Sequence, residues 1–114
     1  MRKIEQDMCR AIRNRETRTF NNTTVVNGLD TAGRPIVEVL LHGNLIARFK
    51  FTESMVQIFD GEWQTVTTKS RLNAILRDFT TGCSVYQKKG VWYLACSNDS
   101  DVLFYDGLHL HFNL

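Results

Sequence analysis

Two different spacings of apolar residues divide this chain into predicted helices and predicted strands. Within residues 2–15, Ile4, Met8 and Ile12 recur at every fourth position, which places them on one face of a helix. A second helix is indicated by apolar residues spaced i, i+3, i+4 and i+7, namely Leu72, Ile75, Leu76 and Phe79. Either Thr67 or Thr68 can cap the start of this second helix, and Gly82 can end it in a left-handed conformation.

Elsewhere apolar and polar residues alternate, as they do in strands with one buried face. Five strands are predicted before the second helix, at 23–27, 36–42, 45–51, 55–59 and 62–66, and four after it, at 83–87, 91–96, 102–105 and 108–112. In 45–51, Leu45, Ala47 and Phe49 fall on the same side. Pro35 lacks an amide donor, so it must open a strand or lie on an edge.

Glycine-containing turns predict that most of these strands are joined as hairpins. The turn sequences are Gly43-Asn44, Asp60-Gly61, Lys88-Lys89-Gly90 and Asp106-Gly107. The sequence therefore predicts one α+β domain over residues 1–114, ordered α-β5-α-β4, with two helices and largely antiparallel β-meanders. Because an Asp-Gly turn recurs in each helix-then-strands half, duplication of one half is an additional hypothesis.

Composition and charge indicate a soluble globular chain with one locally basic segment. Hydrophobic residues make up 43% and charged residues 23% of the 114 positions, and the formal net charge is +2. Residues 1–18 hold six cations and three anions, whereas the remainder holds eight cations and nine anions. No apolar run is long enough to span a bilayer, and the basic start lacks the apolar core of a secretion signal. We therefore expect no membrane partner.

The residue types that carry catalysis or bind metals form no diagnostic pattern. Three cysteines without C-x-x-C spacing predict reduced thiols in a cytosol, each acting as a small buried apolar side chain. His109 and His111 share one face of a predicted strand, which suits a metal pair but equally the solvent side of that strand. We predict no metal, no cofactor and no catalytic residue, and hence a protein that is not an enzyme.

Aromatic and basic residues that cluster at three places favour binding instead. Single-stranded nucleic acid is bound by rings that stack on bases and cations that neutralise phosphates. The predicted nucleic-acid- or anion-binding residues are Thr68, Lys69, Ser70 and Arg71 in the first helical turn, Tyr86, Lys88, Lys89 and Trp92 in one hairpin, and Arg10 and Arg13 in the first helix. Trp63 offers a second stacking position. The alternative interpretation is that Trp63 and Trp92 are core rings and Lys88-Lys89 a solvated turn.

Three blocks of the sequence resemble a family of small proteins encoded by tailed bacteriophages, many from marine and other environmental samples. The blocks are Met1-Arg2-Lys3-Ile4-Glu5-Gln6 with Met8 and Ala11-Ile12-Arg13, His42-Gly43-Asn44 with Ile46-Ala47, and Trp63-Gln64-Thr65 with Thr67-Thr68-Lys69-Ser70-Arg71-Leu72-Asn73-Ala74. The resemblance implies a phage product acting in the cytoplasm of an infected bacterium. It implies no activity, cofactor or catalytic residue.

The partner is predicted as nucleic acid, with two alternatives left open. The same basic surfaces could meet an acidic patch on a host protein, as in an accessory protein that inhibits a host defence or replication factor. A nucleotide-ligand sink could hold phosphates at Thr68–Arg71. A small chain with many strands could also form a homo-oligomer by pairing at a sheet edge.

Overall fold

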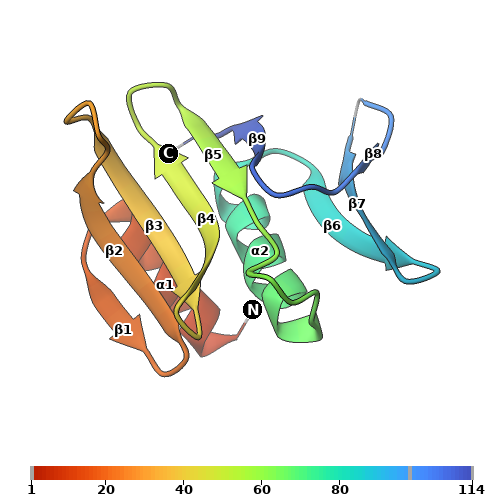
Figure 1. Cartoon of the computed structure of the whole chain (residues 1–114), viewed down its shortest axis with the longest axis horizontal. Helices are drawn as coiled ribbons and strands as arrows, with labels where there is room; N and C mark the ends of the chain where they lie inside the picture. The colour runs from red at the N-terminus through yellow and green to blue at the C-terminus, as the bar shows by residue number, and fades with distance from the viewer. Residues whose placement is uncertain (1, 98, 114) are drawn as a thin grey trace.

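The computed structural model describes residues 2–97 and 99–113, which form two helices and two antiparallel sheets (Figure 1). The helices are α1 (Lys3–Arg13) and α2 (Val66–Phe79). The strands are β1 (Arg18–Phe20), β2 (Thr23–Leu29), β3 (Pro35–Leu41), β4 (Asn44–Lys50), β5 (Met55–Ile58), β6 (Cys83–Lys88), β7 (Val91–Cys96), β8 (Val102–Leu103) and β9 (Leu108–His111). The predicted α+β class is confirmed.

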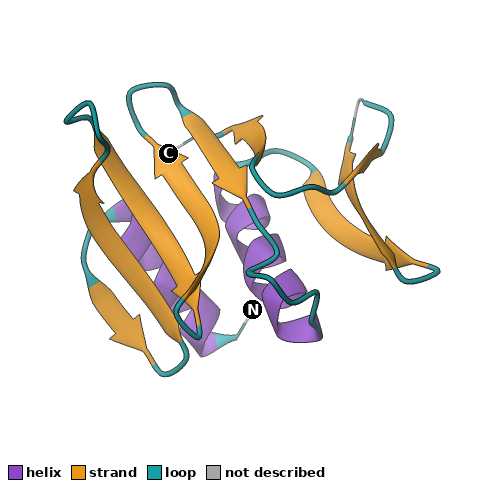
Figure 2. Cartoon of the chain, viewed as in Figure 1, coloured by secondary structure: helices purple, strands orange, loops and turns teal. Residues whose placement is uncertain are grey.

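The larger sheet orders its strands β1-β2-β3-β4-β5-β9, and both helices lie on one of its faces (Figure 2). Its fully buried side chains, among them Val37, Phe49 and Val56, make the core together with the apolar faces of the helices. The smaller sheet, β6-β7-β8, packs against α2. There Asn73 of α2 accepts from the amide of Val85 and donates to its carbonyl, at 2.7 and 3.0 Å.

The two helices run side by side in the same direction. Three contacts join them at a constant sequence offset, Glu5 with Ser70, Cys9 with Ala74 and Arg13 with Asp78. Because the offset stays at 65 residues, both helices start at the same end of the molecule. Figure 1 shows that the β3–β4 and β6–β7 turns lie at this end too. Parallel helices add their dipoles, so this end collects partial positive charge.

Several elements predicted from periodicity are confirmed closely. The first helix buries Met8 and Ile12, and the second buries the four apolar residues that predicted it. Pro35 opens β3. The predicted hairpin of β6 and β7 is confirmed, but its turn is Lys89-Gly90, both with positive φ, because Lys88 pairs with Val91 as the last residue of β6. Local pattern was sufficient for these elements because each one buries a single continuous face.

The predicted strand at 62–66 is wrong, and with it the hairpin across Asp60-Gly61. Glu62 has φ +72, which breaks an extended chain, and the carboxylate of Asp60 accepts from its amide at 2.8 Å. Thr65, rather than Thr67 or Thr68, is the N-cap of α2, and its hydroxyl accepts from the amide of Thr68 at 3.1 Å. The segment is therefore a turn that leads into the helix.

The predicted hairpin across Asp106-Gly107 is also wrong. Its two strands belong to different sheets, since β8 pairs with β7 and β9 pairs with β5. The last strand thus completes the sheet of the first half, and the duplication hypothesis fails because the two halves pair their strands differently. The strand β1 had no prediction. The turn after β3 is His42-Gly43, one residue earlier than predicted, because Leu41 pairs with Asn44.

The prediction of three reduced thiols is corrected. Cys83 and Cys96 face each other across β6 and β7, with Cα atoms 4.2 Å apart, and form a disulfide. Cys9 is free and buried, and burial followed by the nearby Asp78 carboxylate raises its pKa to about 12. A thiol with so high a pKa stays protonated at neutral pH, and only the thiolate is nucleophilic.

Iodoacetamide labelling is expected to reflect this arrangement in three steps. Native unreduced protein should take up no label, because Cys9 is buried and protonated. Unfolded unreduced protein should take up one label, and unfolded reduced protein three. Intact-mass measurement counts the labels. Three labels on unfolded unreduced protein, or rapid labelling of native Cys9, would contradict the structure.

Candidate binding site at the N-terminal end of the helices

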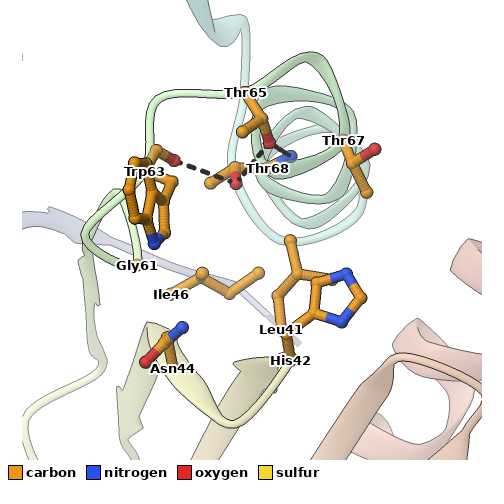
Figure 3. A pocket seen from close by; sticks show the side chains of 9 residues that line it. All are labelled: Leu41, His42, Asn44, Ile46, Gly61, Trp63, Thr65, Thr67 and Thr68. Carbon is orange, nitrogen blue, oxygen red and sulfur yellow. Dashed lines mark hydrogen bonds between the residues drawn. The ribbon is translucent and has the colours of Figure 1, made fainter.

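A pocket of about 410 Å³ opens where the β3–β4 turn meets the start of α2 (Figure 3). It is lined by Leu41, His42, Asn44, Ile46, Gly61, Trp63, Thr65, Thr67 and Thr68. Two segments far apart in sequence therefore build it, the turn between two central strands and the turn that leads into α2. Its volume lies within the range of small-ligand sites.

Trp63 forms an exposed aromatic wall of this pocket. Its side chain is 70% exposed, although the backbone around it is well held. Its amide donates to Asp60, and its carbonyl accepts from the Thr68 hydroxyl at 3.3 Å and the Thr65 amide at 3.1 Å. In Figure 3 the indole stands on one side of the pocket, with Ile46 below it. A fixed backbone therefore presents an open ring face beside an apolar floor.

Polar groups face this ring and floor from two sides. The hydroxyls of Thr65 and Thr68 bond each other at 2.9 Å on the helix side. Asn44 and His42 lie on the strand side (Figure 3). His42 adopts φ +50 in the turn, and its amide donates to the Asn22 carbonyl at 2.8 Å. The pocket thus combines an aromatic wall, an apolar floor and several hydrogen-bonding groups, as ligand pockets commonly do.

Arg71 is not available for an external anion, so its predicted place on an open surface is wrong. It is 3% exposed and donates to Glu5 at 2.9 Å, to the Thr23 hydroxyl at 3.0 Å and to Asn22 at 3.2 Å. Ser70 donates its hydroxyl to the same Glu5 carboxylate at 2.6 Å. Glu5, itself 4% exposed, is the acidic partner that periodicity alone did not reveal.

The aromatic residues of the predicted binding hairpin also make contacts within the protein, which leaves them unavailable for stacking on bases. Trp92 is 1% exposed and packs edge-on against Phe104, so the alternative interpretation of a core ring is confirmed for it. Tyr86 stacks on Tyr93 and donates its hydroxyl to Asp101. This hydrogen bond to the carboxylate raises the pKa of the Tyr86 hydroxyl above its usual value. For Trp63, the core-ring interpretation is wrong.

The remaining predicted residues do not gather at one place. Arg13 pairs with Asp78 at 2.7 Å near the far ends of the helices, and Arg10 lies 3.7 Å from Asp7. Lys69 is half-buried, with its ammonium 3.4 Å from Gln87 and over the Trp92 ring. Lys88 and Lys89 are exposed at the β6–β7 turn, and Thr68 is buried in the pocket wall.

Sequence reasoning missed the strand side of the pocket, His42, Asn44 and Ile46. All three belong to one of the blocks that carry the family resemblance, but the sequence predicted His42 only as the end of a strand, Asn44 only as a turn residue and Ile46 only as part of the next strand. Trp63 was recognised as a stacking candidate. Ile46 lies close to the turn that carries Trp63 because β3, β4 and β5 are consecutive neighbours in the sheet, and the Phe59 amide donates to the Ile46 carbonyl at 2.8 Å. The pocket was missed because a strand was predicted at 62–66, where the structure has a turn and the start of α2.

The two histidines that were considered as a metal pair do not line this pocket. His109 and His111 are exposed on β9, and no group of three or more His, Cys, Asp or Glu side chains in the described part is placed to hold a metal. Neither described helix has the length and apolar character needed to cross a membrane.

Comparison with known proteins supports the phage resemblance. The model of the family described as Kyanoviridae Gp96 protein matches residues 1–111, a span that includes every residue lining the pocket. No curated protein and no solved structure matches the chain. Because the family match covers nearly the whole sequence, the chain belongs to the Kyanoviridae Gp96 protein family, a family of small phage proteins.

Proposed function

We propose that this phage protein is a non-catalytic binder of single-stranded nucleic acid that holds one base against Trp63. The observation that carries the proposal is the pocket itself, in which a 70% exposed indole faces hydroxyl and amide groups. Every base offers a face that can stack on an exposed aromatic ring, whatever the sequence of the strand.

The pocket has the dimensions and chemistry for a single nucleotide unit. Its 410 Å³ fit one base with part of its sugar, and Ile46 and Leu41 form an apolar floor. Asn44 can both donate to and accept from a base edge, and Thr67 supplies a hydroxyl. A base splayed out of a single strand can reach these groups, whereas a paired base cannot.

The charge at this end of the molecule favours a phosphate backbone. The N-termini of both helices lie here, and Arg2 and Lys3 are exposed at the start of α1. Glu62 and Asp60 lie close to the pocket and oppose this attraction, so the electrostatic contribution should be modest. We therefore expect about two neutralised phosphates and a shallow dependence of affinity on salt, with a slope near −1.4 on logarithmic axes.

Substitution of Trp63 by alanine tests this proposal. We expect affinity for a fluorescein-labelled oligothymidylate to fall about 5- to 100-fold, which corresponds to loss of one stacked base. Fluorescence anisotropy at low salt measures it. Val66→Ala is the matched control, because Val66 is 73% exposed nearby but does not line the pocket. Equal affinities for wild type and Trp63→Ala would overturn the proposal.

A free nucleotide is the second candidate ligand, favoured by the single-nucleotide size of the pocket. A sink of this kind would bind a mononucleotide as tightly as an oligonucleotide, and its phosphates would lie at the start of α2 near Thr65 and Thr67. A thermal-shift series separates the two, because bound ligand raises the melting temperature. Stabilisation by mononucleotides alone would favour the sink.

An acidic host protein is the remaining alternative for this surface. In that case one stoichiometric bacterial protein should co-purify after nuclease treatment, and oligonucleotides should not compete with it. Each of these ligands would be met in the cytoplasm of the infected bacterium, which we propose as the site of action.

A further inference from the structure

Two lysines at the β6–β7 turn are not used by the pocket. Lys88 ends β6 and Lys89 forms the turn, and both side chains are exposed. The rings beside them are a buried Trp92 and a Tyr86 tied to Asp101, so this hairpin is poorly suited to stacking bases. The lysines flank a different surface, the face of the smaller sheet that points away from α2.

This outer face of β6-β7-β8 carries an apolar and aromatic row. The register places Tyr86 opposite Tyr93 and Tyr93 opposite Leu103, so the three side chains share one face. The tyrosine rings stack with centroids 5.5 Å apart, and Leu103 is 59% exposed. Val91, 39% exposed, extends the same face toward the turn. Exposed apolar side chains grouped in this way mark interaction surfaces.

Charges of opposite sign lie at the two ends of this face. Lys88 and Lys89 occupy the end where β7 begins, and Asp99 and Asp101 occupy the loop that follows β7. A six-residue strand such as β7 spans roughly 17 Å between its ends. The face is therefore apolar in the middle, positive at one end and negative at the other.

We propose that the outer face of β6-β7-β8 binds a second copy of this chain in a two-fold symmetric dimer. A two-fold axis through the apolar row brings the lysine end of one copy against the aspartate end of the other, twice over. The same face is thus complementary to itself in charge, and Tyr86, Tyr93 and Leu103 lie at the centre, away from water. Tyrosine is among the residues enriched at interface centres.

The outer face of β6-β7-β8 is small, and its area limits the affinity with which two copies associate. Three short strands offer less than the roughly 800 Å² per partner of a stable interface. We therefore expect the dimer to form reversibly at about 100 µM and to weaken as salt screens the end charges. The Trp63 pocket lies outside this face, so the dimer does not depend on the nucleic-acid proposal.

Charge reversal tests the two-fold arrangement in purified full-length protein. Lys88→Glu with Lys89→Glu makes both ends negative, and Asp99→Lys with Asp101→Lys makes both ends positive. By sedimentation velocity each variant alone should be monomeric where wild type dimerises. An equimolar mixture of the two should form heterodimers, and a variant carrying all four changes should recover the homodimer.

These recoveries separate an interface from loss of folding, because a misfolded variant would not regain association when mixed. Leu103→Asp, at the centre of the face, should abolish association, whereas Trp63→Ala should leave it unchanged. A wild-type protein that stays monomeric to 1 mM, about ten times the expected midpoint, would overturn the proposal. So would a dimer that both charge-reversed variants keep, because its interface would then lie elsewhere.

Discussion

Replacing Arg71 with methionine is expected to lower the free energy of unfolding by about 3–5 kcal/mol. The guanidinium is 3% exposed, and it is paired with Glu5 at 2.9 Å. Methionine fills similar volume but removes the guanidinium, so that the buried carboxylate of Glu5 keeps the Ser70 hydroxyl as a donor and has lost its cationic partner. An uncompensated buried charge is among the largest single-residue penalties in proteins. Urea denaturation followed by circular dichroism measures the loss.

The double variant Glu5→Leu with Arg71→Met is the control for this prediction. Replacing a buried ion pair by apolar residues of similar volume is often neutral, so the double variant should be more stable than Arg71→Met alone. A stability of Arg71→Met within about 0.5 kcal/mol of wild type would mean that Arg71 is not a buried charge. The same reasoning implies that loss of oligonucleotide binding in an Arg71 variant would report unfolding rather than a lost phosphate contact.

Replacing Phe49 with alanine is expected to cost about 3–5 kcal/mol of stability. Phe49 is fully buried on β4, and its ring meets Phe79 at 5.0 Å and Phe112 at 5.2 Å between centroids, both edge-on. It therefore joins the larger sheet, the end of α2 and the segment after β9. Alanine would leave a cavity among rings that cannot collapse together, because three separate elements hold them.

Thermal unfolding followed by circular dichroism tests this prediction. Tyr105→Ala is the matched control, because Tyr105 is 55% exposed and should change stability by less than about 0.5 kcal/mol. If Phe49→Ala and Tyr105→Ala have the same melting temperature, the aromatic cluster is not central to the core.

The parts of the fold that sequence predicted are those encoded by a single periodic face. The spacing of Ile4, Met8 and Ile12 placed α1 correctly, and alternation placed most of the strands. The β3–β4 and β6–β7 hairpins followed from their turn residues, whereas the two Asp-Gly turns do not join paired strands. The α+β class followed from the order of these predicted helices and strands along the chain.

The errors are of two kinds: local turns that were taken for strands or shifted by a residue, such as 62–66 and His42-Gly43, and pairings between segments distant in sequence. Nothing local indicates that β9 adds to β5, or that the Asp60-Gly61 turn leads to a helix cap at Thr65. The burial of Arg71 is set by Glu5, which lies 66 residues earlier and comes close only because the helices are parallel. The cross-strand disulfide likewise depends on the β6–β7 register. Trp63 and Thr68 were the parts of the pocket named from the sequence, because an aromatic ring and a hydroxyl beside a helix start are local features.

The fluorescence of Trp63 tests the nucleic-acid proposal most directly. The chain has two tryptophans, and Trp92 is buried in the core, whereas Trp63 is 70% exposed at the pocket. Titration with an unlabelled single-stranded oligonucleotide at low salt should quench part of the emission in a saturable manner. The quenching should disappear in Trp63→Phe, whose emission comes from Trp92 alone. Unchanged wild-type emission, or equal quenching in Trp63→Phe, would contradict a base stacked on Trp63.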